Sequence, residues 1–386
     1  IKNTNAMNKK ATELLKQYGF ERIKAADMID SYNFEDRKLV EIVKATYFNP
    51  KIVVIDETTT ALSQEGREEL YKHMERIRKS GNTVIFISHD LPEIIEKSDT
   101  ITILRDGVYI DTVKSKDVNE NDLKKLMVGR EVTGDYYRSD YGEKVSDEVV
   151  LSVKDVTVPG LIENVSFDLH KGEILGFGGL SESGMHEIGK AIFGASYDRE
   201  GTVELADGTQ INDIPTAIKH SIAYTSKDRD NESVVLNQSI GDNICLPSLD
   251  ELSGPAHLIS DKKKKDFANK FAKQMSVKMV DVNQFVSNLS GGNKQKVVLA
   301  RWIGKDSDIV VLDSPTRGID IKVKQDIYQL MNQMRKNGKS IIMISEELME
   351  LIGMCDRIMI MKDGKISGEL ERDQNLDENG LITMMV

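Results

Sequence analysis

The sequence is poor in cysteine, in tryptophan and in long apolar runs. Its 386 residues include two cysteines and one tryptophan. No run approaches the ~20 consecutive apolar residues that a membrane-spanning helix needs, so the sequence predicts no transmembrane segment. Cys245 and Cys355 lack the spacing of a metal-binding pair, which favours two reduced thiols in a cytosolic protein.

Positive charge is also scarce. The chain has 52 lysines and arginines against 63 acidic residues, a formal net charge of −11. This balance excludes a broad nucleic-acid-binding surface and leaves only a local basic patch open. With 39% hydrophobic and 30% charged residues, the composition is typical of a globular protein, and the length predicts two or three domains.

The sequence repeats itself at an offset of 257 residues. KIVVIDETTTALS at 51–63 aligns with DIVVLDSPTRGID at 308–320, and VIFISHDLPEII at 84–95 aligns with IIMISEELMELI at 341–352. From residue 51 to 110, 21 of 60 positions are identical without a gap. So many matches in one order indicate a tandem duplication.

The duplication predicts three segments: a first copy at 1–130, a linker at 131–148 and a second copy at 149–386. The linker, EVTGDYYRSDYGEKVSDE, is polar and lacks periodicity. In both copies short β-branched strands alternate with amphipathic helices, which predicts an α/β fold with a largely parallel sheet. At the same offset, the glycine-rich loop of the second copy falls before residue 1, so we expect the first copy to be incomplete.

That glycine-rich loop is the stretch GGLSESGMHEIG at 178–189. It follows an apolar strand and matches the phosphate-loop pattern G-x-x-x-x-G-K-[ST] only in its first six positions. Met185 stands where the lysine belongs, and His186 stands where the magnesium-binding hydroxyl belongs. The candidate loop residues are Gly179, Ser181, Ser183, Gly184, Met185 and His186. Taken alone, the loop fits a phosphate site, a damaged phosphate site or an accidental match.

Two acidic residues end the strand IVVIDE at 52–57. Asp56 and Glu57 then lie at the carboxyl edge of the sheet, where nucleotide phosphates bind in such folds. There Asp56 can organise a magnesium ion and Glu57 can polarise a water molecule for attack on a phosphate. The alternative is a pair that only caps the next helix. His89, in ISHD at the end of a later strand, reaches the same edge or is a structural histidine.

The most specific motif is NLSGGNKQKVVLARW at 288–302. Ser290 supplies a helix N-cap, and Gly291 and Gly292 let backbone N–H groups approach an anion at the positive end of the helix. An ordinary helix cap is the alternative, but it needs neither the two glycines nor the Lys-Gln pair that follows. The candidate anion-binding residues are Leu289, Ser290, Gly291, Gly292, Asn293 and Gln295.

These motifs together resemble the tandem ATP-binding subunit of bacterial carbohydrate importers. LSGGNKQKVVLARW, VVLDSPTRGID and ISEELMELIGMCDRI are similar to its second half, and KLVEIVKA, DETTTALS and ISHDLPEI to its first. The family is the ribose, galactose and xylose type of ATP-binding cassette (ABC) importer, with relatives in nucleoside uptake. The resemblance implies two tandem P-loop NTPase cassettes, the first of them incomplete.

The resemblance also implies the setting in which the chain works. It predicts a peripheral ATPase on the cytoplasmic face of the membrane that uses ATP and Mg²⁺. Its partners would be membrane permease subunits and, indirectly, an extracytoplasmic solute-binding protein. Two rival interpretations remain open: a cassette ATPase that acts on ribosomes or DNA, and a catalytically silent fragment. No residue indicates which solute is carried.

In this family each ATP lies between the phosphate loop of one cassette and the LSGG signature of the other. The resemblance therefore assigns Asp56 to the metal, Glu57 and His89 to catalysis, and residues 289–295 to the facing signature. Together these residues compose one hydrolytic site, which lacks only the phosphate loop of the first copy.

At the other site several residues differ from those that the family has at the matching positions. Asp313 remains at the metal position, but Ser314 replaces the catalytic glutamate and Glu346 replaces the histidine. Lys227 stands where the family commonly has an acid. The facing signature is YNFED at 32–36, in which Asn33 and Glu35 belong to the degenerate site.

Three acidic residues, Glu35, Glu182 and Glu346, are expected near the phosphates of a nucleotide at this degenerate site. Each anion would repel a phosphate charge ~5 Å away by roughly 3 kcal/mol at an effective dielectric constant of ~20. The expectation is one hydrolytic site and one degenerate site that binds nucleotide loosely.

Overall fold

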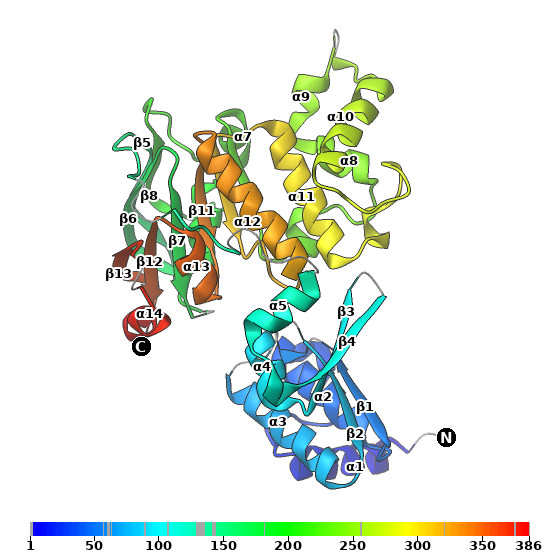
Figure 1. The fold of residues 1–386 in the computed structure, drawn as a ribbon. Coiled ribbons are helices and arrows are strands. Elements are labelled where there is room, and N and C mark those ends of the chain that lie inside the picture. Colours follow the sequence, from blue (N-terminus) through cyan, green and yellow to red (C-terminus); the bar gives the residue numbers. More distant parts are fainter. Residues whose placement is uncertain are drawn as a thin grey trace. The chain divides into compact units, whose positions relative to one another are not determined.

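The computed structural model divides the chain into two compact units, Ile1–Val132 and Thr133–Val386, drawn as a ribbon in Figure 1. The units are described separately below. The residues that the structure describes are 3–56, 58–59, 62, 64–88, 90–105, 108–128, 136–140, 144–180, 182–254, 257–319, 321–373 and 376–385.

The first unit alternates helices with short strands. Its elements are α1 (Thr4–Gln17), α2 (Phe34–Thr46), β1 (Ile52–Asp56), α3 (Gln64–Lys79), β2 (Thr83–Ile87), α4 (Leu91–Lys97), β3 (Thr100–Arg105), β4 (Val108–Lys114) and α5 (Glu120–Val128). Strands β1 and β2 pair in parallel, and β3 and β4 form an antiparallel hairpin. A core under α1, α2 and α3 includes Leu15, Leu39 and Leu70.

One face of the β1–β2 pair is apolar and open. Alternate side chains along a strand point to opposite faces, so Val53 and Ile55 are buried in the core. The side chains on the other face, Ile52, Val54, Ile85 and Ile87, are 45–58% exposed.

The second unit holds a larger sheet. Its elements up to the glycine-rich loop are β5 (Val149–Val158), β6 (Ile162–His170) and β7 (Ile174–Gly179). There follow α6 (Met185–Ile192), β8 (Glu200–Leu205), α7 (Ile214–Lys219), β9 (Ile222–Thr225), α8 (Ile240–Cys245), α9 (Leu249–Leu252), α10 (Asp261–Gln274) and α11 (Gly291–Lys305). The last are β10 (Ile309–Asp313), α12 (Ile321–Lys336), β11 (Ser340–Ile344), α13 (Leu348–Met354), β12 (Arg357–Lys362), β13 (Lys365–Glu371) and α14 (Glu378–Met385).

The main sheet has the strand order β13-β12-β7-β11-β10-β9, parallel except for the β12–β13 hairpin. Every residue of β7, β10 and β11 is buried, as expected for parallel strands with helices on both faces. A separate antiparallel sheet, β6-β5-β8, packs beside it, and α8 to α11 form a helical lobe (Figure 1). The predicted α/β fold with a largely parallel sheet is therefore confirmed for this unit.

The helices and strands of the first unit recur in the second at the same offset of 257 residues. The bounds of α1, β1, α3, β2 and α4 match those of α10, β10, α12, β11 and α13 residue for residue. The strand register matches as well, because Asp56 pairs with Ile87 in one unit and Asp313 with Ile344 in the other.

A buried carboxylate network also recurs. Glu93 in the first unit and Glu350 in the second each accept hydrogen bonds from a threonine, a serine and a tyrosine. The donors are Thr59, Ser88 and Tyr71 in the first unit and Thr316, Ser345 and Tyr328 in the second. Since the six donors lie at matching positions, the two units share tertiary contacts as well as secondary structure.

Part of the expected linker belongs to the second unit. Arg138 is 4% exposed and donates hydrogen bonds to Asp140 (2.9 Å), Asp356 (2.7 Å) and the Met354 carbonyl (2.7 Å). Asp140 also accepts a hydrogen bond from Arg335. The second unit thus begins at residue 133 in the structure, earlier than the predicted start at 149.

We expect Asp140→Asn to lower the melting temperature of the protein by a few degrees at pH 7, because it removes one of the two charged partners of buried Arg138, a loss of about 1–3 kcal/mol. Burial raises the pKa of Asp140, but hydrogen bonds from Arg138 and its charge outweigh burial and hold the pKa below its ordinary value. A depressed carboxyl pKa stabilises the fold above the unfolded-state pKa, and this stabilisation is lost as the pH falls through the folded-state pKa.

The deficit of the variant should therefore shrink in acid, which calorimetry at a series of pH values would measure. Asp147→Asn is the matched control at an exposed aspartate and should change little. A deficit that stays constant down to the lowest pH would contradict the assigned charge pairing.

Candidate functional site

Two positions of the glycine-rich loop require glycine. Gly184 precedes α6 with φ +90°, and a Cβ there would lie 2.6 Å from the Leu161 carbonyl oxygen. A Cβ on Gly179 would lie 2.7 Å from the Met361 carbonyl oxygen. Both positions therefore require glycine, as a loop that turns tightly from strand to helix does. The accidental match left open by the sequence is disfavoured.

The side chains of this loop differ from those of a working site. Met185 is fully buried in the core of the second unit, so it presents no cation to a phosphate. The hydroxyl of Ser183 is buried and has no hydrogen-bond partner among the described residues. Glu182 is exposed, and Ser181 lies outside the described residues.

Four charged or titratable side chains meet at the start of α6, and we call them the His186 cluster: His186, Lys227, Asp313 and Glu346. His186 Nδ1 lies 2.7 Å from Asp313 Oδ1, and His186 Nε2 lies 3.3 Å from Glu346 Oε1. The Lys227 ammonium lies 2.8 Å from Glu346 Oε1 and 3.1 Å from His186 Nε2. Parallel strand order explains the meeting, because β9, β10, β11 and β7 end at one edge.

The carboxylate of Asp313 is engaged on both oxygens. Its side chain is 1% exposed. Besides His186, Oδ1 accepts a hydrogen bond from Ser314 (3.2 Å), and Oδ2 accepts a longer one from Tyr224 (3.4 Å). The sequence analysis missed Tyr224, although its place three residues before Lys227 puts it at the same strand end as Asp313.

The protonation of His186 reflects these contacts. Burial lowers the pKa of the imidazole, but its hydrogen bonds to Asp313 and Glu346 outweigh burial, so the pKa lies above its ordinary value. The cluster thus pairs its own charges before any ligand arrives.

The expected role of Glu346 as an uncompensated anion is wrong. The sequence placed this carboxylate near the phosphates as a source of repulsion. In the structure Lys227 and His186 lie within 3.3 Å of it and offset its charge. The departures at Glu346 and Lys227 therefore compensate each other.

The helix after the signature motif begins with open backbone donors. Ser290 is the N-cap of α11 and makes no side-chain cap hydrogen bond to the helix backbone within the described chain. Its hydroxyl instead lies 3.0 Å from Asn293 Nδ2. The first-turn N–H groups at Gly291 and Gly292 thus face no capping oxygen from Ser290, which suits an incoming anion. Arg229, missed in the sequence, lies beside Gly291, 3.2 Å from a Cβ built there.

Two of the predicted signature residues are buried. Leu289 is 8% exposed and belongs to the core, and Gln295 is 5% exposed. Asn293 accepts a hydrogen bond from the backbone N–H of Lys278 (2.7 Å), which holds the start of α11 against the preceding loop.

The matching helix start in the first unit is closed. Asn33 is the N-cap of α2, and its side chain accepts a hydrogen bond from the Asp36 N–H (2.8 Å). Glu35 and Asp36 place two carboxylates in the first turn, and Glu35 lies against Gly66. Side chains already occupy the positive end of this helix, so it is poorly suited to bind a phosphate.

The structure describes one of the three candidate metal-binding and catalytic residues of the first unit. Asp56 ends β1 and is exposed. Glu57 and His89 lie outside the described residues. Ser88, one residue before His89, donates a hydrogen bond to Glu93 (2.7 Å), which ties the end of β2 to α4.

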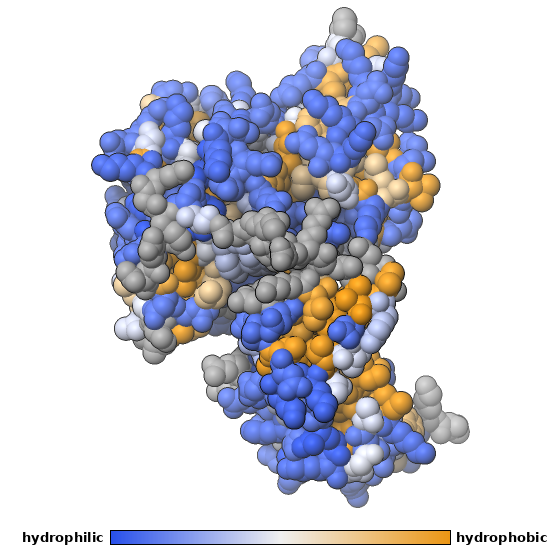
Figure 2. All heavy atoms as spheres, in the orientation of Figure 1, coloured by the Kyte–Doolittle hydropathy of each residue, from blue (hydrophilic) through white to orange (hydrophobic). Residues whose placement is uncertain are grey.

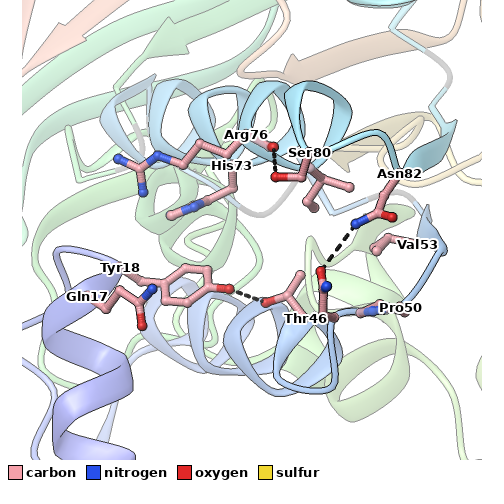
Figure 3. Close-up of a pocket in the computed structure, with 11 residues that line it drawn as sticks. Gln17, Tyr18, Thr46, Pro50, Val53, His73, Arg76, Ser80 and Asn82 are labelled. Atoms are coloured by element: carbon pink, nitrogen blue, oxygen red, sulfur yellow. Dashed lines mark hydrogen bonds between the residues drawn. The ribbon is translucent and has the colours of Figure 1, made fainter.

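The first unit also contains a cavity of about 450 Å³. Figure 3 shows side chains from α1, α2 and α3 around it. Tyr18 and Thr46 share a hydrogen bond of 2.8 Å across one wall, and His73 extends from α3. Asn49 and Asn82 precede β1 and β2, so the cavity lies at the amino ends of these strands. Asp56 lies at the other edge, and the cavity is therefore separate from the candidate nucleotide site.

Apolar side chains gather on parts of the visible surface. In Figure 2 they form a patch over β3 and β4 of the first unit, where Leu104, Val108 and Tyr109 are 60–63% exposed. Within the part of the chain that the structure describes, no helix is long and apolar enough to cross a membrane.

Comparison with known proteins places these features in context. The family profile for ABC transporters matches residues 162–317. The ribose import ATP-binding protein of Lactococcus lactis subsp. cremoris (strain SK11) is 39% identical over 380 residues, 98% of this chain and 76% of its own length. The xylose import ATP-binding protein of Thermoanaerobacter pseudethanolicus is 43% identical over 343 residues, 86% of this chain and 68% of its own length.

Solved structures agree on the fold. The dimeric structure of a bacterial ABC transporter cassette superposes with a TM-score of 0.51 at 22% identity and covers 58% of this chain and 99% of that one. A post-hydrolysis state of the same cassette with ADP and phosphate gives the same score. The chain spans 66–76% of the length of the first curated relatives that it matches.

Proposed function

Since this chain belongs to the family of ATP-binding subunits of ABC sugar importers, we propose that it is part of an ATPase that energises the import of a sugar. The observation that carries the ATPase part is the open signature helix, with Ser290 not capping α11. The sugar comes from the relatives, which are named for ribose and xylose import. A ribose- or xylose-like pentose is the first solute to test.

We propose further that the chain contains two tandem cassettes, 1–130 and 149–386, with the first cassette incomplete. The stretch 131–148 joins them, and within it Arg138 and Asp140 bind to the second unit. The recurring elements, the equal register of Asp56 and Asp313, and the twofold carboxylate network support a duplication. The open face of the first unit supports an incomplete first cassette. Ile52 and Val54 are exposed there, whereas the matching Ile309 and Val311 of the second unit are buried. In the second unit α6 packs on β10 and β11.

The two nucleotide sites of such a tandem protein would be unequal. We propose that Asp56, Glu57 and His89 work with the signature of the second cassette to hydrolyse ATP. The open start of α11 supports this, because its backbone donors suit a phosphate. The second site would pair the His186 cluster with the closed helix start at Asn33 and Glu35. That site is degenerate in both halves.

Magnesium enters this proposal only at the hydrolytic site. Asp56 is exposed at the strand end, and a carboxylate oxygen is a ligand that Mg²⁺ prefers. A bound ion there would neutralise phosphate charge during hydrolysis. The protein's own residues would orient the attacking water, through Glu57, and sense the phosphate, through His89.

The partners follow from the family. We propose that the subunit docks on membrane permease subunits at the cytoplasmic face and that a solute-binding protein reaches it only through them. The helical lobe between the phosphate loop and the signature is the docking region to test. Leu246 and Leu258 there are 48% and 73% exposed.

The test is ATP hydrolysis by a subunit with the whole length of its relatives, reconstituted with its permease in proteoliposomes. We expect the permease and the sugar-loaded binding protein to stimulate hydrolysis. The control omits the permease. Hydrolysis that ignores the permease and responds to ribosomes or DNA instead would replace this proposal by the non-transport cassette.

A further inference from the structure

The His186 cluster occupies the place where a phosphate-loop NTPase holds its magnesium ion. In such enzymes the ion is bound by the phosphate-loop Ser or Thr hydroxyl and the strand-end Asp. Here an imidazole replaces the hydroxyl and bonds directly to the aspartate, His186 Nδ1 to Asp313 Oδ1 at 2.7 Å. Mg²⁺ demands oxygen ligands in near-ideal octahedral geometry, so the residues present do not fit it.

The remaining capacity of Asp313 is also reduced. Its carboxylate accepts from His186 and Ser314 on one oxygen and from Tyr224 on the other. A carboxylate offers about four lone-pair positions, and three of them have partners here. An ion could bind Oδ1 of Asp313 only after the buried imidazole of His186 had moved away.

A softer metal does not fit this cluster either. Imidazole suits zinc, but the two nitrogens of His186 bond to different carboxylates, Asp313 on one side and Glu346 on the other. The three side chains therefore do not converge on one point. Among the described residues, no group of three or more such side chains is placed to hold a metal.

A positively charged side chain of the protein, rather than a metal ion, lies beside His186 and Glu346. The Lys227 ammonium, on the segment after β9, reaches His186 and Glu346. Its side chain is 26% exposed, so it is accessible to a ligand in the glycine-rich loop. An ammonium is a phosphate-binding point charge. Met185 supplies no charge, and Lys227 is a cation that the described structure places at this site.

We propose that this second site binds a nucleotide without magnesium, with Lys227 and the backbone N–H groups at the start of α6 as its phosphate contacts. A phosphate would replace Glu346 as the partner of Lys227. The hydrogen bond from His186 keeps Asp313 closed to the ion. The inference rests on the proposed ATPase function and concerns the site on the second cassette.

The test is equilibrium binding of a fluorescent ATP analogue and of ATP to this chain, once with Mg²⁺ and once with EDTA. The chain contains one phosphate loop, at 179–184, so the titration reports on that site. ATP in solution binds Mg²⁺ and would have to release it to enter this site, so we expect binding in EDTA to be at least as tight as binding with Mg²⁺.

Two variants sharpen the result. His186→Thr restores the hydroxyl and frees Asp313, so Mg²⁺ should now tighten nucleotide binding by about tenfold. Lys227→Gln should weaken binding in EDTA by about tenfold. The controls are His220→Thr at the end of α7 and Lys171→Gln in an exposed ion pair with Glu148, and both should behave as the unaltered chain does.

The outcomes separate this inference from the proposed function. Binding that requires Mg²⁺ in the unaltered chain overturns the inference and leaves the ATPase proposal standing. An unchanged affinity in Lys227→Gln overturns the assigned phosphate contact. Failure to bind nucleotide in either buffer overturns the inference and removes the second cassette from nucleotide binding altogether.

Discussion

Replacing Glu57 by glutamine in the full-length subunit is expected to lower the rate of ATP hydrolysis at least about 100-fold. Glutamine keeps the shape of the side chain but cannot accept a proton from the attacking water. The matching change in the second unit, Ser314→Ala, is expected to leave the rate nearly unchanged. The two variants thus test which half of the duplication performs the chemistry.

The structure supplies the reason for this asymmetry. Asp56 and Asp313 end equivalent strands in equal register, and in the sequence Glu57 and Ser314 follow them at the repeat offset of 257 residues. In the second unit the hydroxyl of Ser314 is 3.2 Å from Asp313 Oδ1. A serine has no carboxylate to act as general base. Replacing Ser314 by alanine therefore removes one hydrogen bond and no catalytic group.

The measurement is kcat at saturating MgATP for the subunit bound to its permease. Nucleotide affinity, measured separately, should persist in Glu57→Gln, because only the chemical step is affected. Thermal unfolding of both variants controls for misfolding. Comparable losses of kcat in the two variants would show that the roles are assigned wrongly.

The sequence predicts the α/β fold because its signal is local. Buried strands such as β10 and β11 are unbroken runs of branched apolar residues, and the glycines at 179 and 184 mark a tight turn between strand and helix. These features depend on residues that are close in the sequence, so the structure has them as the sequence predicts. The family assignment is confirmed by the relatives for the same reason.

The internal charge pairing of the second site could not be predicted from the sequence. His186 and Asp313 are 127 residues apart, and Lys227 and Glu346 are 119 apart. Strand order brings these positions to one edge, but only side-chain conformations decide that Lys227 neutralises Glu346. Counting acidic residues therefore overstated the repulsion at this site.

The start of the second unit could not be predicted from the sequence for a different reason. Arg138 and Asp140 are charged residues in a polar stretch, which is the usual composition of a linker. Their burial depends on partners that the chain supplies more than 190 residues later, Arg335 and Asp356. A buried charge pair and an exposed linker are indistinguishable in composition.

Gly292→Glu in the full-length subunit is the second variant from which we expect a large effect. It places in the open signature the carboxylate that the first unit carries at the matching position, Glu35. The start of α11 would then hold a negative charge within ~5 Å of a phosphate, a repulsion of roughly 3 kcal/mol at an effective dielectric constant of ~20. Hydrolysis is therefore expected to fall about 100-fold.

Two controls separate charge from bulk. Gly292→Gln adds a side chain of the same size without charge, so it should retain clearly more activity than Gly292→Glu if repulsion is the cause. Glu35→Gly changes the helix start of the degenerate site and should leave hydrolysis nearly unchanged. The readout is again kcat and KM for MgATP in the permease complex. Equal losses for the glutamine and glutamate variants would mean that the signature needs space rather than neutrality, and a large loss in Glu35→Gly would place catalysis at the other site.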